Sequence, residues 1–206
     1  MSNRIAESEL FINPDGSIYH LNLKPEHLAS TVIAVGDPER VSKVSRYFDE
    51  IEYSVSKREF VTHTGYYKGK RLTVMSTGMG TDNIDIFMTE LDALVNIDLR
   101  TRIPKENHTT LNIIRVGTSG SMRKEIPAGT MLASEYGIGL DTLMAFYNTE
   151  YSHLEQKVGR KIQEDLELSF TPYCVKGSKK LLYLLGEGLL IGNTVTCPGF
   201  FGPQGR

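Results

Sequence analysis

The chain has few of the features that mark secreted, membrane-spanning or nucleic-acid-binding proteins. Cys174 and Cys197 are its two cysteines, and they form no Cys-x-x-Cys pair and have no histidine at metal-ligand spacing. Lysine and arginine number 23 against 25 acidic residues, so the formal net charge of -2 offers no basic surface to nucleic acid or to an anionic membrane. These absences predict a reduced intracellular protein without a metal centre.

No apolar run is long enough to cross a bilayer. The longest, LLYLLGEGLLIG (181–192), is too short and is interrupted by glycine. The start of the chain, MSNRIAESELFINPDGS, contains no apolar segment of signal-peptide length. We therefore expect a cytoplasmic protein with no membrane partner.

The chain does contain short apolar strands that alternate with amphipathic helices. Segment 31–35 (TVIAV) is a β-branched run, and the helix expected after it has Asp37 as cap and Pro38 as first residue. A second helix is predicted over 81–95, with Thr81 and Asp82 as capping residues. Other strands are expected within 51–78 (three, the last two joined at KGK) and at 111–117, 131–139, 171–175 and 189–196, with helices at 153–168 and 178–185.

This alternation predicts a single α/β domain over residues 1–206 with a mostly parallel central sheet. The chain has no internal repeat, low-complexity tract or linker that would mark a second domain. Segment 111–117 is apolar enough for a buried central strand. In open α/β sheets ligands bind at the carboxyl ends of strands, so the loops that follow strands are the candidate sites.

Two of these loops suit an anion. In VGDPERV (35–41), Gly36 lets a ligand approach the backbone and Arg40 lies in the first helical turn, although the same residues also fit a simple capped helix. In IIRVGTSGS (113–121), Arg115 interrupts an apolar strand just before a loop rich in N–H and hydroxyl donors. Unless the strand is an edge, that guanidinium needs a fixed anionic partner, which is either a bound phosphate or a structural carboxylate.

A third loop, STGMGTDN (76–83), begins like a dinucleotide fingerprint but has Asn83 where the last glycine is required. Gly78 and Gly80 are therefore interpreted mainly as turn residues. The missing glycine also argues against a nicotinamide-dependent oxidoreductase. Arg58, in SKREF, is by default a surface charge on a strand.

Together with the terminal FFGPQGR, the motifs VGDPERV, SKREF, MSTGMG and IRVGTSG resemble, in sequence and spacing, the uridine phosphorylase branch of the nucleoside phosphorylases. The resemblance runs from about residue 20 to residue 206. It implies a mixed central β-sheet flanked by helices in a three-layer fold, and a homodimer or hexamer whose subunits share active sites. It also implies inorganic phosphate as co-substrate and no cofactor, with a structural monovalent cation near Glu59 left open.

The same resemblance implies the phosphate and ribose contacts. His20 would lie near the ribose 5′-hydroxyl of a neighbouring subunit's site, where its alternative is an exposed side chain without a role. The phosphate ligands would be Gly36, Arg40, Arg115 and Thr118, together with Arg58 of the partner subunit.

Gln204 and Arg206 are the implied pyrimidine readers, with Phe200 as an aromatic face for the base. In an extended segment, residues i and i+2 face the same way, so both side chains could address one edge of uracil while Gly205 keeps the backbone close. The glutamine amide offers an acceptor and donors, and uracil shows an N3–H between two carbonyls. Without the resemblance, Phe200 could equally be a loop phenylalanine tucked into the core.

The implied activity is reversible phosphorolysis of uridine to uracil and ribose 1-phosphate, in pyrimidine nucleoside salvage. Phosphate is already nucleophilic, so positioning and charge stabilisation suffice, and Arg115, Thr118 and Arg206 would supply them. The rival functions are a purine nucleoside phosphorylase, a nucleosidase, or a phosphate- or nucleoside-binding module without turnover. Members of the family continue past the Gln-x-Arg loop, so we expect that this chain is truncated within that loop. The sequence assigns no role to the long loop 96–110.

Overall fold

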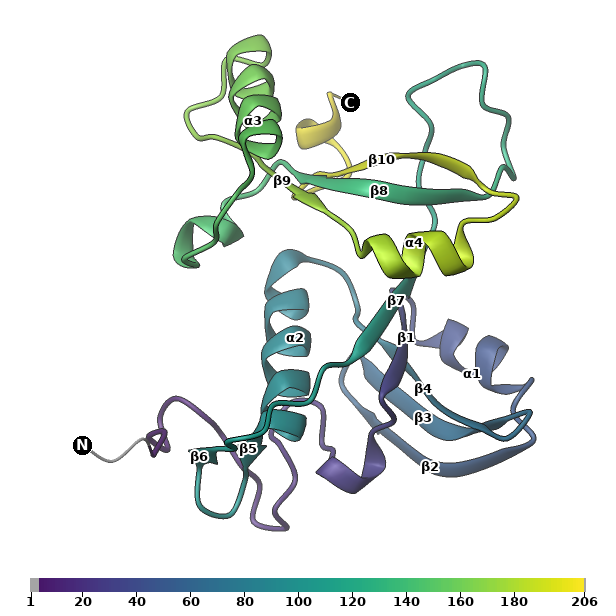
Figure 1. Ribbon diagram of the computed structural model, residues 1–206, viewed down its shortest axis with the longest axis vertical. Coiled ribbons are helices and arrows are strands. Elements are labelled where there is room, and N and C mark those ends of the chain that lie inside the picture. The colour runs from purple at the N-terminus through teal and green to yellow at the C-terminus, as the bar shows by residue number, and fades with distance from the viewer. Residues whose placement is uncertain (1–3, 206) are drawn as a thin grey trace. The chain divides into compact units, whose positions relative to one another are not determined.

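The computed structural model in Figure 1 describes residues 4–205, and the chain divides at Gly117 into two units. We call Met1–Gly117 the amino-terminal unit and Thr118–Arg206 the carboxyl-terminal unit, and describe each by itself. The expectation of a single domain over residues 1–206 stays a prediction. Within residues 4–205, no helix combines the length and the apolar character that crossing a membrane requires.

The amino-terminal unit is built on a five-stranded sheet in the order β2-β3-β4-β1-β7. Strand β1 pairs in parallel with both β4 and β7, whereas β2, β3 and β4 form an antiparallel meander. The sheet is therefore mixed, as the resemblance implied, and the prediction of a mostly parallel sheet is wrong. The strands are β1 (Thr31–Val35), β2 (Glu50–Lys57), β3 (Phe60–Tyr67), β4 (Lys70–Ser76) and β7 (Asn112–Val116).

Strand β7 lies at the edge of this described sheet, so its prediction as a buried central strand is wrong. Its residues are half-buried or exposed along the whole strand. The apolar run 111–114 packs through Leu111 and Ile113 onto one side of the core, which explains its hydrophobic character without a neighbour on both edges.

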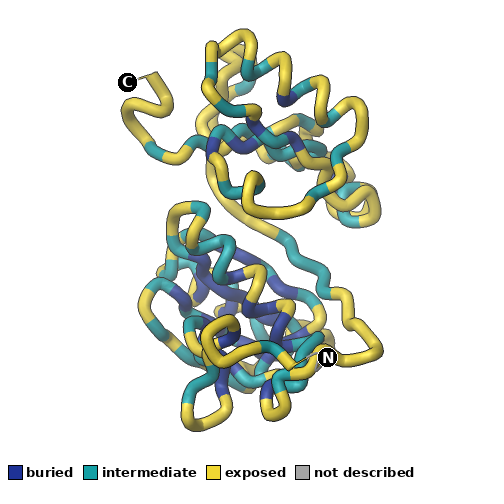
Figure 2. Tube along the Cα trace, turned by 90° about the vertical axis from the view of Figure 1, so that its left-hand side faces the viewer, coloured by how far each residue is buried: buried dark blue, intermediate teal, exposed yellow. Residues whose placement is uncertain are grey.

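Helices cover both faces of the sheet (Figure 1). Helix α2 (Thr81–Asn96) packs on the face that carries Val32 and Ala34, and α1 (Glu39–Ser45) packs on the face that carries Val35. Neighbouring residues of β1 thus point to opposite faces, as the period of a strand requires. Most buried apolar residues of this unit, dark blue in Figure 2, lie in this sheet, in α2 and in segment 10–29.

The two helix starts differ from each other. The Asp37 carboxylate accepts the Glu39 N–H at 2.9 Å, but α1 begins at Glu39 with Pro38 at the N-cap position, so the predicted helix start at Pro38 is one residue early. Helix α2 begins after Gly80, whose φ of 100° is open to glycine, and no side chain caps it. The predicted caps Thr81 and Asp82 are therefore wrong, because the backbone turn at Gly80 sets this helix start.

The loop 96–110 forms a small hairpin of β5 (Ile97–Asp98) and β6 (Ile103–Pro104). Its main chain bonds to the amino-terminal segment, where the Ile5 N–H donates to the Arg102 carbonyl at 2.8 Å, and the Arg102 guanidinium donates to the Leu10 carbonyl. The hairpin therefore anchors the amino-terminal segment, which is a structural role that the sequence did not assign.

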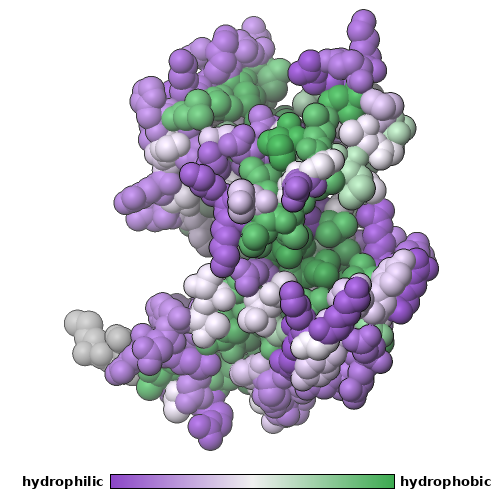
Figure 3. Space-filling view, turned by 45° about the vertical axis from the view of Figure 1, so that its right-hand side comes forward, coloured by the Kyte–Doolittle hydropathy of each residue, from purple (hydrophilic) through white to green (hydrophobic). Residues whose placement is uncertain are grey.

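The carboxyl-terminal unit is built on a three-stranded sheet in the order β10-β8-β9, in which β10 is parallel and β9 antiparallel to β8. Within residues 4–205, both clusters of buried apolar side chains belong to the amino-terminal unit. Hydrophobic side chains of the carboxyl-terminal unit reach the surface, where Figure 3 colours such residues green. Its strands and α-helices confirm the predicted order: β8 (Leu132–Gly139), α3 (His153–Asp165), β9 (Tyr173–Lys176), α4 (Lys179–Leu185) and β10 (Leu190–Thr196). The 3-10 turns η2 (Leu143–Phe146) and η3 (Gly202–Gln204) were not predicted.

Candidate functional site

Three of the predicted loops leave the amino-terminal sheet at the carboxyl ends of neighbouring parallel strands. In the register of the parallel strands, Val35 at the end of β1 pairs with Ser76 of β4 and with Val116 of β7. The Thr77 N–H then donates to the Val35 carbonyl at 2.8 Å. The loops that begin at residues 36, 77 and 117 are therefore neighbours, at the edge where ligands of α/β sheets bind.

The Arg115 guanidinium occupies the space between two of these loops. A Cβ atom built on Gly36 would lie 3.6 Å from Arg115 Nη2, and one built on Gly117 would lie 2.0 Å from Nη1. Gly117 thus leaves the room that the arginine head takes, whereas a Cβ at Gly36 would be in ordinary van der Waals contact with it. At Gly36, an added Cβ would meet only Arg115 Nη2 at 3.6 Å and the Gly78 carbonyl at 3.8 Å, so the loop backbone there is open to a ligand.

Arg115 has no carboxylate partner within the part of the chain that the structure describes. The strand that carries it is an edge strand and the residue is exposed, so its charge does not need the fixed partner that a buried central strand would require. The alternative of a structural carboxylate for Arg115 therefore finds no support among residues 4–205. Its planar fork of N–H groups is available to a bound anion.

Arg40 and Arg58 lie on segments that reach the same edge. Arg40 is half-buried in the first turn of α1, and its N–H donates to the Asp37 carbonyl at 3.0 Å. Arg58 is exposed in the turn between β2 and β3 with a φ of 55°, so its default placement on a strand is wrong.

That turn lies beside the end of β4. Ser76 Oγ donates to the Glu59 carbonyl at 2.6 Å and accepts the Val61 N–H at 2.7 Å. The Glu59 side chain in turn packs on Gly78, where an added Cβ would lie 2.8 Å from Glu59 Cγ. Both Gly78 and Gly80 have positive φ, which confirms their interpretation as turn residues.

His20 is half-buried and is held by a residue that the sequence did not single out. Its ring Nδ1 lies 2.6 Å from Glu90 Oε1, and the alternative of a solvent-exposed bystander is therefore wrong. Glu90 lies in the apolar stripe of α2 with Phe87, Leu91 and Leu94. A carboxylate inside a stripe of spacing i, i+3, i+4 and i+7 was the signal that could have found it.

The predicted base-binding residues belong to the carboxyl-terminal unit and differ locally from the expected geometry. Gln204 is exposed at the end of the 3-10 turn η3, and Gly205 follows with a φ of 71°, so the prediction of an extended segment is wrong there. Phe200 is 65% exposed and is not tucked into a core. Thr118 is exposed at the start of this unit, and Arg206 lies outside the described residues.

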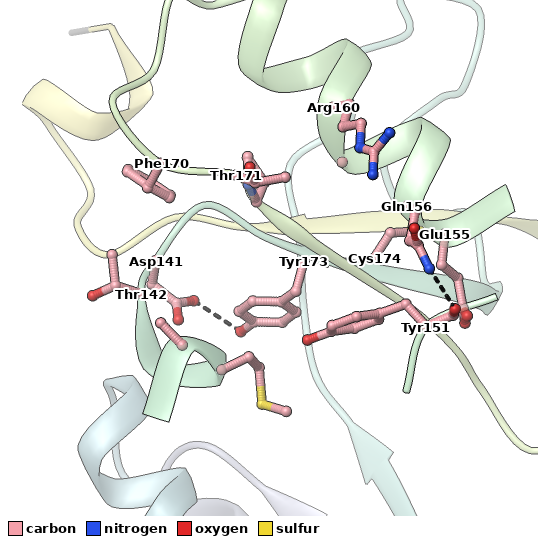
Figure 4. Close-up of a pocket in the computed structure, with 14 residues that line it drawn as sticks. Asp141, Thr142, Tyr151, Glu155, Gln156, Arg160, Phe170, Thr171, Tyr173 and Cys174 are labelled. Atoms are coloured by element: carbon pink, nitrogen blue, oxygen red, sulfur yellow. Dashed lines mark hydrogen bonds between the residues drawn. The ribbon is translucent and has the colours of Figure 1, made fainter. Parts of the chain in front are cut away.

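The carboxyl-terminal unit also has a cavity of about 430 Å³ between η2, α3 and β9 (Figure 4). Two hydrogen bonds join residues of its lining: the Tyr173 hydroxyl donates to Asp141 at 2.9 Å, and the Gln156 amide donates to the Tyr151 carbonyl at 2.9 Å. Burial, and then the bond to Asp141, raise the pKa of the Tyr173 phenol. None of the residues predicted from the sequence lines this cavity.

Residues 30–204 match the family model described as the phosphorylase superfamily, which covers most of the chain. The chain belongs to the phosphorylase superfamily. The resemblance recognised from the five sequence motifs is confirmed at the level of the superfamily, and the α/β fold with a mixed sheet flanked by helices is confirmed with it.

Other members of the phosphorylase superfamily show how far the likeness extends. A crystal structure of a Trypanosoma brucei nucleoside phosphorylase, reported to show uridine phosphorylase activity, is 32% identical with a TM-score of 0.87, over 96% of this chain and 71% of that one. A uridine phosphorylase of Thermococcus kodakarensis is 30% identical over 100% of this chain and 64% of its own length. A DeoD-type purine nucleoside phosphorylase of Clostridium novyi is 38% identical over 52% of this chain and 41% of its own. The chain thus spans less than two thirds of these two curated relatives.

Proposed function

We propose that this chain serves in a pyrimidine nucleoside phosphorylase that converts uridine and phosphate reversibly into uracil and ribose 1-phosphate. The observation that carries the proposal is the Arg115 guanidinium seated between Gly36 and Gly117, at the joined carboxyl ends of the parallel strands. Membership of the phosphorylase superfamily and two relatives named for uridine phosphorylase activity support the choice of reaction.

In the proposed reaction, the guanidinium holds phosphate rather than activating a protein nucleophile. Two parallel N–H donors of Arg115 bind two phosphate oxygens, and the open backbone at Gly36 lets the anion approach closely. A third phosphate oxygen bonds to the ribose C1′ as the C1′–N1 bond breaks, and the bond electrons leave with the uracil. Positioning and charge stabilisation are then the main sources of rate, and phosphate is a co-substrate that calls for no cofactor.

The remaining assignments are parts of the same proposal. Arg40, Arg58 and Thr118 add donors to the phosphate, Gln204 and Phe200 meet the base, and Arg206 stabilises charge on the leaving uracil. His20 and Arg58 act in the site of a neighbouring subunit, in a homodimer or hexamer. A monovalent cation near Glu59 is a proposed structural ion.

The test of the proposed function is base release from three nucleosides. We expect the chain to release free base from uridine faster than from inosine, with thymidine as a second pyrimidine, and only when inorganic phosphate is present. Release without phosphate would identify a nucleosidase instead. A preference for inosine would favour a purine nucleoside phosphorylase, which is the second candidate because the Clostridium novyi relative has that name.

The position of the Arg115 guanidinium beside Gly117 provides a second test. In Gly117→Ala, the new methyl group would lie 2.0 Å from Arg115 Nη1, so the flexible arginine head must move while the backbone is unaffected. We expect phosphate affinity to fall about tenfold or more, the cost of one charge-assisted hydrogen bond, in isothermal titration calorimetry.

Gly120→Ala is the matched control for this variant. A Cβ at Gly120 would meet nothing within 4 Å, so phosphate affinity should equal that of the parent chain. Circular dichroism should show the same helix content in both variants. If Gly117→Ala binds phosphate as the parent chain does, the seat of Arg115 is not the anion site.

A further inference from the structure

Glu90 is a buried carboxylate that grips the segment carrying His20. It is 7% exposed, and its two oxygens lie within hydrogen-bond distance of three nitrogen atoms of that segment. The His20 main-chain N–H lies 3.0 Å from Oε1 and 3.1 Å from Oε2, and the Leu21 N–H lies 2.8 Å from Oε2. The third group is ring Nδ1 of His20, at 2.6 Å from Oε1.

The helix fixes where this carboxylate stands. Glu90 shares the inward face of α2 with Phe87, Leu91 and Leu94, each of which is at most 1% exposed. In Figure 1 the purple amino-terminal segment runs beside α2, and the bonds above join the two across 69 and 70 residues of chain. The carboxylate therefore cannot swing away from the ring without disturbing a packed core.

No lysine or arginine pairs with Glu90 within residues 4–205. A buried carboxylate without such a partner must be satisfied by hydrogen bonds, and the two main-chain N–H groups already supply both oxygens. The contact to the His20 ring is an addition that holding the main chain does not require.

This contact determines the state of the imidazole. An ionised carboxylate only accepts hydrogen bonds, so ring Nδ1 carries the hydrogen, and in the neutral ring Nε2 is the acceptor. An edge contact with the Tyr19 ring, at 4.8 Å between centroids and 85° between planes, also restricts the imidazole. The His20 side chain remains 25% exposed, and Nε2 has no hydrogen-bond partner among the residues described.

We propose that Glu90 is a positioning residue that locks His20 in the Nδ1–H tautomer and so offers Nε2 as an acceptor to the ribose 5′-hydroxyl. The inference rests on the proposed function for the identity of the ligand, whereas the lock itself rests on the contacts of Glu90 alone. The ribose hydroxyl can donate its hydrogen to Nε2 only while that nitrogen is unprotonated. In the other tautomer Nε2 carries the hydrogen, so the hydroxyl would face a second donor.

The first experiment measures the tautomer directly in the chain, with no dependence on turnover. Nitrogen-15 NMR of histidine-labelled protein, with His20 assigned through His20→Ala, should show a protonated Nδ1 and an unprotonated Nε2 where the ring is neutral. Glu90→Gln keeps the size of the side chain and should give a mixture of tautomers. Asp92→Asn, an exposed carboxylate on the same helix, is the matched control and should leave the His20 signals unchanged. A tautomer mixture in the parent chain, or no change in Glu90→Gln, overturns the proposal.

The second experiment asks whether the lock serves the 5′-hydroxyl. We expect Glu90→Gln to lower kcat/KM for uridine by about three- to tenfold, the value of one neutral hydrogen bond, and to leave 5′-deoxyuridine unchanged. In a His20→Ala background, Glu90→Gln should have no further effect. Equal losses on both nucleosides, or a loss that persists without His20, would mean that Glu90 only supports the fold.

The two experiments separate the inference from the proposed function. If the parent chain releases base from no nucleoside while His20 shows the Nδ1–H tautomer, the proposed function is wrong but the role of Glu90 in fixing the tautomer stands. If the parent chain cleaves uridine but Glu90→Gln behaves like Asp92→Asn in both assays, the lock fails and the proposed function stands.

Discussion

Arg115→Ala should lower kcat/KM for uridine phosphorolysis by about 100-fold or more, because it removes two charge-assisted hydrogen bonds of about 1.5–3 kcal/mol each. The change leaves the strand pairing of β7 intact, since that pairing uses main-chain atoms. The loss should appear mainly as a higher KM for phosphate. This is measured by varying the phosphate concentration at a fixed concentration of uridine.

Arg100→Ala is the control for removing a positive charge from the same unit. Its side chain is 93% exposed and lies 3.7 Å from the Asp98 carboxylate, so its ion pair contributes little. Activity should stay within about twofold of the parent chain, the effect of a weak surface pair. If Arg115→Ala stays equally active, the phosphate is bound elsewhere and the proposed site is wrong.

Phe87→Ala should lower the free energy of unfolding by about 3–5 kcal/mol. Phe87 is 1% exposed and lies in the larger apolar cluster between α2 and the sheet, where surrounding side chains cannot collapse fully into the space it leaves. Urea unfolding followed by circular dichroism measures the change.

The neighbouring Met88→Ala is its control, since Met88 is 46% exposed on the same helix. Its loss should stay below about 1 kcal/mol, as for a surface substitution without special contacts. Equal losses in the two variants would show that the large cluster is not the stabilising core of this unit.

The predictable part of this molecule is the part that neighbouring residues specify. The strands and helices follow from local hydrophobic periods, and the positions of the loops after Val35 and Val116 follow because parallel strands end at a common edge. Arg115 was found because a charge inside an apolar run is costly unless something accounts for it.

The rest depends on contacts between distant residues, which local patterns do not encode. The edge position of β7 is set by which strand pairs with β1, and the bond between His20 and Glu90 joins residues 70 positions apart. Turn geometry was also missed: Gly80 begins α2 through its backbone conformation, and the segment around Gln204 coils where period-two reasoning assumed extension.

The anchoring of the amino-terminal segment has a consequence for assembly under the proposed function. Besides Glu90, the Lys57 ammonium donates to the Tyr19 carbonyl, and the β5–β6 hairpin bonds to Ile5. If His20 serves a neighbouring subunit's site, as we propose, its side chain is already held in place on its own protomer. Association then sacrifices little loop entropy, and a preorganised histidine can complete the adjoining centre on first encounter.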